Sequence, residues 1–301
     1  MPRPLRGVLS VFQTPYHDDE SIDFDTLDRE FDYIFGHGAD GVVMAMVSEI
    51  LRLSTDEREA VAAHVCKSVG GRGSVVVSVG AESTHTAIRL TKQAEAAGAD
   101  GLMAIPPVSI GLGEDQLIRY YERILNATTL PVVVQDASGY VGRPMSIQLQ
   151  ARVMHEFGCE RVYFKPEAAP IGPRLSALRD ATGGAARIFE GTGGIALVDS
   201  HRRGIVGTMP GAEIIDALVA LWNALEAGDE KRAYEISLPV SSLIAIQTSL
   251  DGFLAVEKHL LVKRGIFQST RVRGPVGFQL DDETIAEVDR LFDMLQGVLK
   301  G

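Results

Sequence analysis

The 301-residue chain has few cysteines, few aromatic residues and no excess of basic residues. Its two cysteines, Cys66 and Cys159, cannot form the framework of disulfides that a small secreted domain needs. We therefore expect reduced thiols and a cytoplasmic protein. The formal net charge is −11, and acidic and basic residues are interspersed. This charge argues against nucleic acid or an anionic membrane as a partner, because both bind basic surfaces.

Long apolar segments and metal-binding motifs are also missing. No stretch approaches the roughly 18 apolar residues of a membrane span, and residues 1–12 contain no apolar core long enough for a signal peptide. Histidine, aspartate and glutamate never occur at metal-ligand spacing such as His-x-His or HExxH. We therefore predict neither a membrane segment nor a metal site.

What the chain does contain is an alternation of two kinds of segment. Longer segments with helical periodicity separate short ones rich in β-branched residues, and Ser54 and Glu57 have the spacing of a helix-capping box in one of the longer segments. The short ones predict strands buried on both faces, as in a parallel sheet. They are Gly7–Phe12, Gly41–Ala45, Ser74–Val79, Gly101–Ile105, Leu130–Gln135, Arg161–Lys165, Arg187–Glu190 and Gly204–Met209.

An internal repeat sets the period of this alternation. The pattern Gly-Ala-Asp-Gly at residues 38–41 recurs sixty residues later at 98–101, which corresponds to two strand–helix units of about thirty residues. Eight such units fit between about residue 7 and about residue 227 and predict a closed (β/α)8 barrel, or TIM barrel. An open doubly wound sheet is the alternative. It would want a glycine-rich phosphate loop after the first strand, and residues 12–15 do not form one.

After about residue 228 the alternation ends. Three helices with no intervening strand are predicted, at Glu230–Thr248, Asp251–Arg264 and Asp282–Leu299. We interpret residues 1–227 as the barrel and residues 228–301 as a C-terminal helical appendix packed on it.

Lys165 is the first candidate for chemistry, because reactive groups of such barrels lie at the C-terminal ends of strands. It ends the apolar run Val162–Phe164, where the barrel mouth would enclose it. Desolvation favours the neutral form of an amine, which is the nucleophile that imine formation needs. The alternative is a strand-end lysine that extends to solvent.

The other candidate site residues also follow predicted strands. For Glu49, a loop carboxylate that holds backbone N–H groups is the favoured interpretation, with a catalytic role as the alternative. Ser48 and neighbouring N–H groups could bind a carboxylate, while Tyr140 could be either a surface or a site residue. The predicted catalytic residues are Lys165, Gln135 and Glu167, and the predicted substrate-binding residues are Val47, Ser48, Glu49, Gly191 and Thr192.

In this order, the features resemble the dihydrodipicolinate synthase / N-acetylneuraminate lyase family of class I aldolases. The resemblance covers essentially the whole chain and implies a Schiff base at Lys165 and a homotetramer. It rests on Thr14-Pro15, Glu49 with Leu53-Ser54 and Glu57-Arg58, Leu130-Pro131, Lys165, the glycine-rich turn after Glu190, and Gly204-Ile205-Val206-Gly207.

The departures from the family pattern are informative. Residues 45–49 read Ala-Met-Val-Ser-Glu where the family usually has Gly-Thr-Thr-Gly-Glu, and Gln135-Asp136 replaces Tyr-Asn. Pro107-Val108 replaces an aromatic pair, and Gly139-Tyr140 stands where the family's carboxylate-binding arginine would be. The hydroxyl relay of the lysine-pathway synthases is therefore missing, which argues against dihydrodipicolinate synthesis.

One subgroup shares the divergent segments. Val47-Ser48-Glu49, Val-Gln-Asp-Ala at residues 134–137 and Tyr-Phe-Lys-Pro-Glu at 163–167 are similar to the 2-keto-3-deoxy-L-arabonate dehydratases. The resemblance implies a cofactor-free lyase whose small-molecule partner is a 2-keto-3-deoxy sugar acid, and elimination of water as its reaction. A pyruvate-dependent aldolase or synthase-like enzyme is the alternative. A sugar-acid-binding paralogue without activity is a third possibility, which retention of Lys165 argues against.

Overall fold

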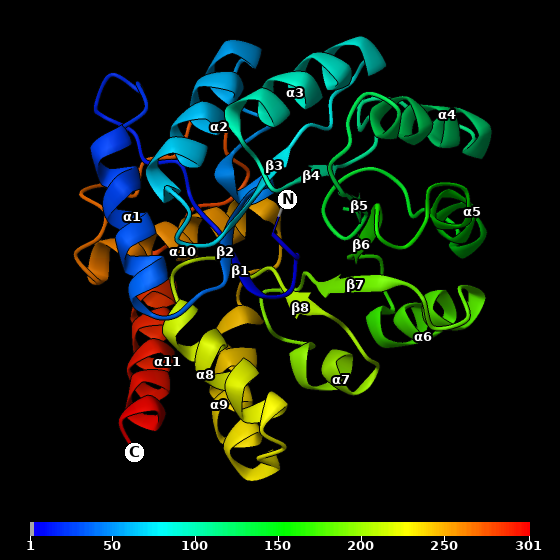
Figure 1. Ribbon diagram of the computed structural model, residues 1–301. Helices are drawn as coiled ribbons and strands as arrows, with labels where there is room; N and C mark the ends of the chain where they lie inside the picture. Colours follow the sequence, from blue (N-terminus) through cyan, green and yellow to red (C-terminus); the bar gives the residue numbers. More distant parts are fainter. Residues whose placement is uncertain (1–2) are drawn as a thin grey trace.

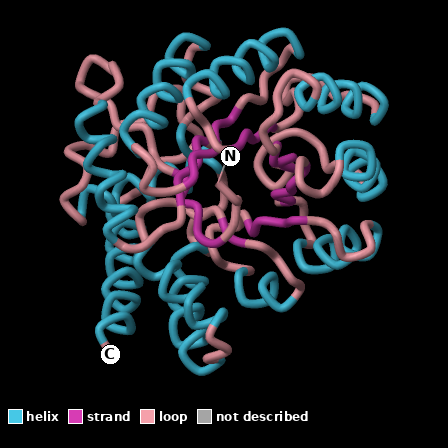
Figure 2. Tube along the Cα trace, in the orientation of Figure 1, coloured by secondary structure: helices cyan, strands magenta, loops and turns pink. Residues whose placement is uncertain are grey.

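The structure is a computed structural model that describes residues 3–301. Eight parallel strands close into a barrel in chain order, so that each strand pairs with the next and β8 returns to β1 through Gly7–Gly207 and Val8–Thr208. Figure 2 shows the ring of strands enclosed by helices. The strands are β1 (Gly7–Val11), β2 (Gly41–Met44), β3 (Ser74–Ser78), β4 (Gly101–Ala104), β5 (Val132–Asp136), β6 (Val162–Pro166), β7 (Arg187–Glu190) and β8 (Gly207–Thr208).

Helices follow each strand and form the outer layer of the molecule (Figure 1). A short 3-10 helix, η1 (Met46–Ser48), follows β2. The α-helices are α1 (Phe24–Gly36), α2 (Thr55–Val69), α3 (Thr84–Ala97), α4 (Glu114–Leu125), α5 (Ile147–Phe157), α6 (Ile171–Ala181), α7 (Leu197–Arg202), α8 (Ile215–Glu226), α9 (Glu230–Ile244), α10 (Leu250–Lys263) and α11 (Asp282–Lys300).

The predicted barrel and its C-terminal helices are confirmed. The strand starts and ends lie within a few residues of the predicted ones, and Ser54 and Glu57 form the predicted capping box at the start of α2. The helix predicted to end at Thr248 ends instead at Ile244, because residues 245 and 246 form a turn before Ser249 caps α10. The division at residues 227–228 falls between α8 and α9 and stays a prediction.

Two apolar layers hold the barrel together. One lies between strands and helices, and the other fills the barrel with alternate residues of the strands, such as Leu9, Val43, Val133 and Tyr163. Successive residues of a strand point to opposite faces. Because Val133 and Tyr163 point inward, the residues two positions later on β5 and β6 also point inward, at the C-terminal end of the barrel.

Helix α10 joins the appendix to this end of the barrel. It contacts η1 and lies across the C-terminal ends of the strands, while α9 and α11 pack beside α8 (Figure 1). None of the helices within residues 3–301 is long and apolar enough to cross a membrane.

Candidate active site

Lys165 and Gln135 are neighbours at the inner face of the barrel. They occupy paired positions of β6 and β5, two residues beyond the inward-facing Tyr163 and Val133. Both side chains are buried, and Lys165 is only 4% exposed. The alternative in which this lysine extends into solvent is therefore excluded.

Glu167 completes this group. Its backbone N–H donates to the Asp136 carbonyl at 2.9 Å, so strand pairing continues past Pro166 and Glu167 faces the same side as Lys165. Its Oε1 lies 3.0 Å from the Lys165 Nζ, and the Gln135 Nε2 donates to its Oε2 at 2.7 Å. Burial raises the pKa of Glu167 above its ordinary value, while the Lys165 ammonium and these hydrogen bonds oppose that rise.

Gly191, directly after β7, has no side chain, and the Lys165 and Glu167 side chains occupy the space beside it. A Cβ at this position would lie 2.6 Å from the Lys165 Cε and 2.9 Å from the Glu167 Oε1. Both distances are too short for non-bonded atoms, so a larger residue here would displace the Lys165–Glu167 pair. The requirement for glycine explains one element of the glycine-rich turn.

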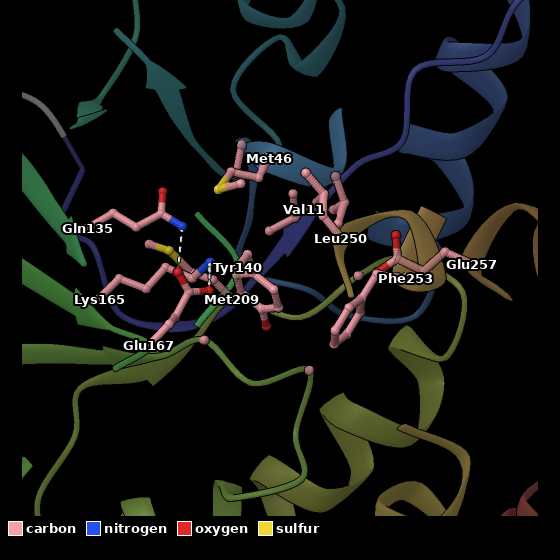
Figure 3. A pocket seen from close by; sticks show the side chains of 15 residues that line it. Val11, Met46, Gln135, Tyr140, Lys165, Glu167, Met209, Leu250, Phe253 and Glu257 are labelled. Carbon is pink, nitrogen blue, oxygen red and sulfur yellow. Dashed lines mark hydrogen bonds and ion pairs between the residues drawn. The ribbon is translucent and has the colours of Figure 1, made fainter. Parts of the chain in front are cut away.

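These residues line a cavity at the C-terminal end of the barrel. Figure 3 shows Lys165, Gln135 and Glu167 together on one side, with α10 side chains on the other. The lining consists of Val11, Ala45, Met46, Val47, Gln135, Tyr140, Lys165, Glu167, Gly191, Gly193, Met209, Gly211, Leu250, Phe253 and Glu257.

Four of these lining residues were not predicted from the sequence as site residues. The role of Tyr140 was left open, and the other three were not singled out. Tyr140, in the loop after β5, packs edge-on against Phe253 with ring centroids 5.6 Å apart. Phe253, Leu250 and Glu257 belong to α10, more than 80 residues from Lys165 in the chain. The available signal was a pair of charged residues, Glu257 and Lys258, within an otherwise apolar stretch of that helix.

Three predicted site residues have other contacts and do not line the cavity. The Ser48 hydroxyl donates to the Phe12 carbonyl at 2.6 Å and accepts from the Ala45 N–H at 3.1 Å. Thr192 donates through its N–H and its hydroxyl to the Glu190 carboxylate and thereby orders the turn after β7. These side chains shape the loops around the cavity.

Glu49 is the third, and its carboxylate is fully engaged. Its Oε1 lies 2.5 Å from the Lys258 Nζ, and its Oε2 accepts from the Arg273 N–H at 3.2 Å. Its backbone is in the left-handed region, with φ of 58°, directly after η1. The geometry matches the favoured interpretation of a loop carboxylate that holds neighbouring groups.

Comparison with known proteins identifies the family. The chain matches the Dihydrodipicolinate synthetase family over residues 4–294. It belongs to that family. As a dihydrodipicolinate synthetase family member it is a lyase, and the predicted family is confirmed.

Individual relatives of this family member differ in activity. Over 289 residues, 94% of this chain and 92% of the relative, it is 29% identical to L-2-keto-3-deoxyarabonate dehydratase of Azospirillum brasilense. It is 33% identical over 147 residues, about half of each chain, to 4-hydroxy-tetrahydrodipicolinate synthase of Moorella thermoacetica. A prophage protein of the family from E. coli K12, solved in complex with pyruvate, superposes with a TM-score of 0.88 over 97% of this chain and 98% of that one, at 23% identity.

The paired Lys165 and Glu167 side chains can support addition of an amine to a carbonyl group. A buried lysine can add to a carbonyl group once it loses its proton, and Glu167 lies at hydrogen-bonding distance to accept that proton. Within the described chain, no group of three or more His, Cys, Asp or Glu side chains is placed to hold a metal ion.

Proposed function

We propose that the chain is a Schiff-base-forming lyase that removes water from a 2-keto-3-deoxy sugar acid, with Lys165 as the nucleophile. The observation that carries this proposal is the buried Lys165–Glu167 pair, 3.0 Å apart, inside a cavity beside Gln135. The name of the Azospirillum relative and the pyruvate bound by the E. coli relative support it.

Imine formation comes first. Glu167 accepts a proton from the Lys165 ammonium, and the neutral amine adds to C2 of the keto acid. Glu167 returns its proton to the hydroxyl of the resulting carbinolamine, water leaves, and the protonated imine forms with Glu167 again a carboxylate. We assign the carboxylate of the acid to the backbone beside Val47, which lines the cavity.

Elimination follows from the imine. The C3–H becomes acidic because its electron pair can move to the imine nitrogen, and Glu167 removes that proton. Burial raises the pKa of Glu167 above its ordinary value, which makes its carboxylate a stronger base. A water held by Gln135 and Ser48 is the other candidate base, and the position of Ser48 outside the cavity lining favours Glu167.

The C4 hydroxyl then departs as water. Tautomerisation and hydrolysis of the imine release a semialdehyde and restore Lys165, so the substrate loses one water in total. Tyr140 lines the cavity, and burial raises the pKa of its phenol well above the ordinary value. Its phenol therefore keeps its proton and can donate a hydrogen bond to the departing hydroxyl, which takes its proton from the carboxyl group of Glu167.

Aldol cleavage makes a different demand. A retro-aldol enzyme must remove the proton of the C4 hydroxyl, and Gln135 cannot accept a proton near neutral pH. Tyr140 is a donor for the reason just given. The pyruvate-dependent aldolase is therefore the second candidate function. For the synthase reaction, we expect negligible condensation of pyruvate with aspartate semialdehyde.

Product analysis tests the reaction. With 2-keto-3-deoxy-L-arabonate we expect one equivalent of 2,5-dioxopentanoate by NMR and no pyruvate in a coupled lactate dehydrogenase assay. A Gln135→Tyr variant should dehydrate more slowly. Stoichiometric pyruvate from the wild-type protein would establish the aldolase instead. Homotetramer formation is a separate prediction, which light scattering can check.

A further inference from the structure

The cavity contains a second buried carboxyl group, on the side opposite Lys165. Glu257 of α10 is 2% exposed, and its Oε2 accepts a hydrogen bond from the Gln13 Nε2 at 2.8 Å. Its Oε1 makes no hydrogen bond with any residue in the described range 3–301, and the side chain lines the cavity (Figure 3). The mechanism proposed above gives this group no role.

Other acidic side chains surround Glu257. A Cβ at Gly211 would lie 2.4 Å from the Glu213 Oε2 and 2.5 Å from the Glu257 Oε1, so the two carboxyl groups lie close together beside Gly211. Glu30 is buried nearby and accepts from the Gln13 N–H at 2.9 Å. Burial, together with the charges of Glu213 and Glu30, raises the pKa of Glu257 well above its ordinary value.

The charge of Lys258 opposes the rise in the pKa of Glu257, but its ammonium makes its hydrogen bonds elsewhere. Lys258 follows Glu257 in the chain, but its Nζ contacts the Thr14 carbonyl, the Glu49 carboxylate and the Arg271 carbonyl. An ammonium has three donors, and these contacts use all of them. Among the described residues that line the cavity, Lys165 is the sole cation. In the proposed mechanism its nitrogen is bonded to C2 of the substrate.

We infer that the Glu257 side of the cavity selects an uncharged, hydroxyl-bearing tail of the substrate, and that Glu257 binds this tail as a neutral carboxylic acid. This inference rests on the proposed function and narrows its substrate class. A neutral carboxyl group donates one hydrogen bond and accepts another, which matches a hydroxyl. An anionic tail would meet carboxyl groups without a counterion, and a buried unpaired charge is strongly unfavourable.

The apolar neighbours fit the same tail. Leu250 and Phe253, from the same helix as Glu257, line the cavity with Tyr140 packed against Phe253. The Leu250 and Phe253 side chains offer contacts to the carbon chain of a sugar acid but no donors for a phosphate or a second carboxylate. Recognition of the tail at this end therefore depends on Glu257.

A matched pair of substrates tests the inference with the wild-type protein. 2-Keto-3-deoxy-L-arabonate and its 5-phosphate share one carbon chain, and the phosphate replaces the terminal hydroxyl with a larger, anionic group. We expect kcat/KM for the phosphate to be lower by about 100-fold or more, the size typical of a site that leaves a buried polar group mismatched. Comparable kcat/KM values for the two would overturn the inference.

Two variants assign the selection to Glu257. Glu257→Gln keeps a donor and an acceptor and should retain most of the affinity for the neutral substrate. Glu257→Leu should raise KM for it by about 10-fold or more, with a smaller change in kcat. A folded Glu257→Leu protein with the wild-type KM would refute the role of Glu257. If this variant does not fold, the comparison of the two substrates with the wild-type protein still tests the selection of an uncharged tail.

Pyruvate separates this inference from the proposed function, because it has no tail. Borohydride reduction with pyruvate reports only the imine at Lys165, by intact mass and peptide mapping. A labelled Lys165 together with equal turnover of the two arabonates would overturn the tail selection alone. Absence of labelling with every 2-keto acid would overturn both.

Discussion

Lys165 and Lys258 are both buried, and they differ in what surrounds the ammonium group. The Lys258 Nζ contacts the Thr14 carbonyl at 2.8 Å, the Glu49 carboxylate at 2.5 Å and the Arg271 carbonyl at 2.6 Å. These partners come from three separate segments of the chain. Lys258 therefore has every donor matched and connects α10 to the loops after β1 and β2.

Lys165 has one ion-pair partner, Glu167, and the rest of its ammonium faces a cavity. Burial alone does not distinguish a structural lysine from a reactive one, since Lys258 is the more deeply buried of the two. The distinguishing feature is the number of satisfied donors together with access to a cavity. The comparison predicts that the two lysines respond differently to a keto acid and to substitution.

The largest difference should appear in covalent labelling. Pyruvate and borohydride should add one ligand mass at Lys165 and none at Lys258, as located by peptide mapping. Lys165→Ala should abolish both the label and turnover, because Lys165 is the only lysine among the described residues that line the cavity. A label on Lys258, or on any other lysine of the wild-type protein, would remove the basis for the mechanism.

Glu167 should have the next largest effect. Glu167→Gln keeps the hydrogen bond to Gln135 possible but removes the proton acceptor beside Lys165. We expect kcat to fall by roughly 10²–10⁴-fold, the usual contribution of a general base. Glu156→Gln, an exposed position on α5, serves as the control. If Glu167→Gln retained the wild-type kcat, the base would have to be another group.

Much of this site was predictable from the chain because it lies at strand ends. The apolar run before Lys165 and the two-residue period of a strand place Gln135, Lys165 and Glu167 on one face. Pro166 made the position of Glu167 uncertain, and the hydrogen bond to the Asp136 carbonyl resolves it. Regular periodicity also predicted the barrel itself.

The rest depends on chain segments that meet only in the folded protein. Glu257 reaches the cavity because α10 lies across the barrel end, and no local pattern encodes that contact. Ser48 and Thr192 sit in the expected loops, but their hydroxyls bond to the protein's own carbonyl and carboxylate groups. Sequence position indicates the loop, whereas the direction of a side chain depends on its folded partners.

Stability should reveal the role of Lys258. Lys258→Met leaves Glu49 buried without a counterion, and the free energy of unfolding should fall by about 3–5 kcal/mol. Lys263→Met, on the same helix, removes only partly exposed ion pairs to Asp289 and Asp293 and should change it by less than about 1 kcal/mol. Urea denaturation measures both. Equal stability of the two variants would show that the buried Lys258–Glu49 pair contributes little. A double variant that adds Glu49→Gln to Lys258→Met should recover part of the lost stability.

The smallest effect concerns the acidic group that Lys258 does not neutralise. Burial raises the pKa of Glu213 from 4.5 to about 7, so between these two values the folded chain holds a proton that the unfolded chain has released. Stability contributed by this group is therefore present at low pH and is lost as the pH rises through about 7, by about 1.4 kcal/mol per pH unit within that window. Burial also raises the pKa of Glu30 and Glu257, so these groups contribute to the pH dependence of the wild type as well. The contribution of Glu213 is therefore measured as the difference in pH slope between wild type and variant. Glu213→Gln should flatten the decline in unfolding free energy between pH 5 and 7 relative to the wild type, whereas Glu235→Gln, a half-exposed position on α9, should not. The same pH slope in Glu213→Gln and wild type would mean that Glu213 ionises normally.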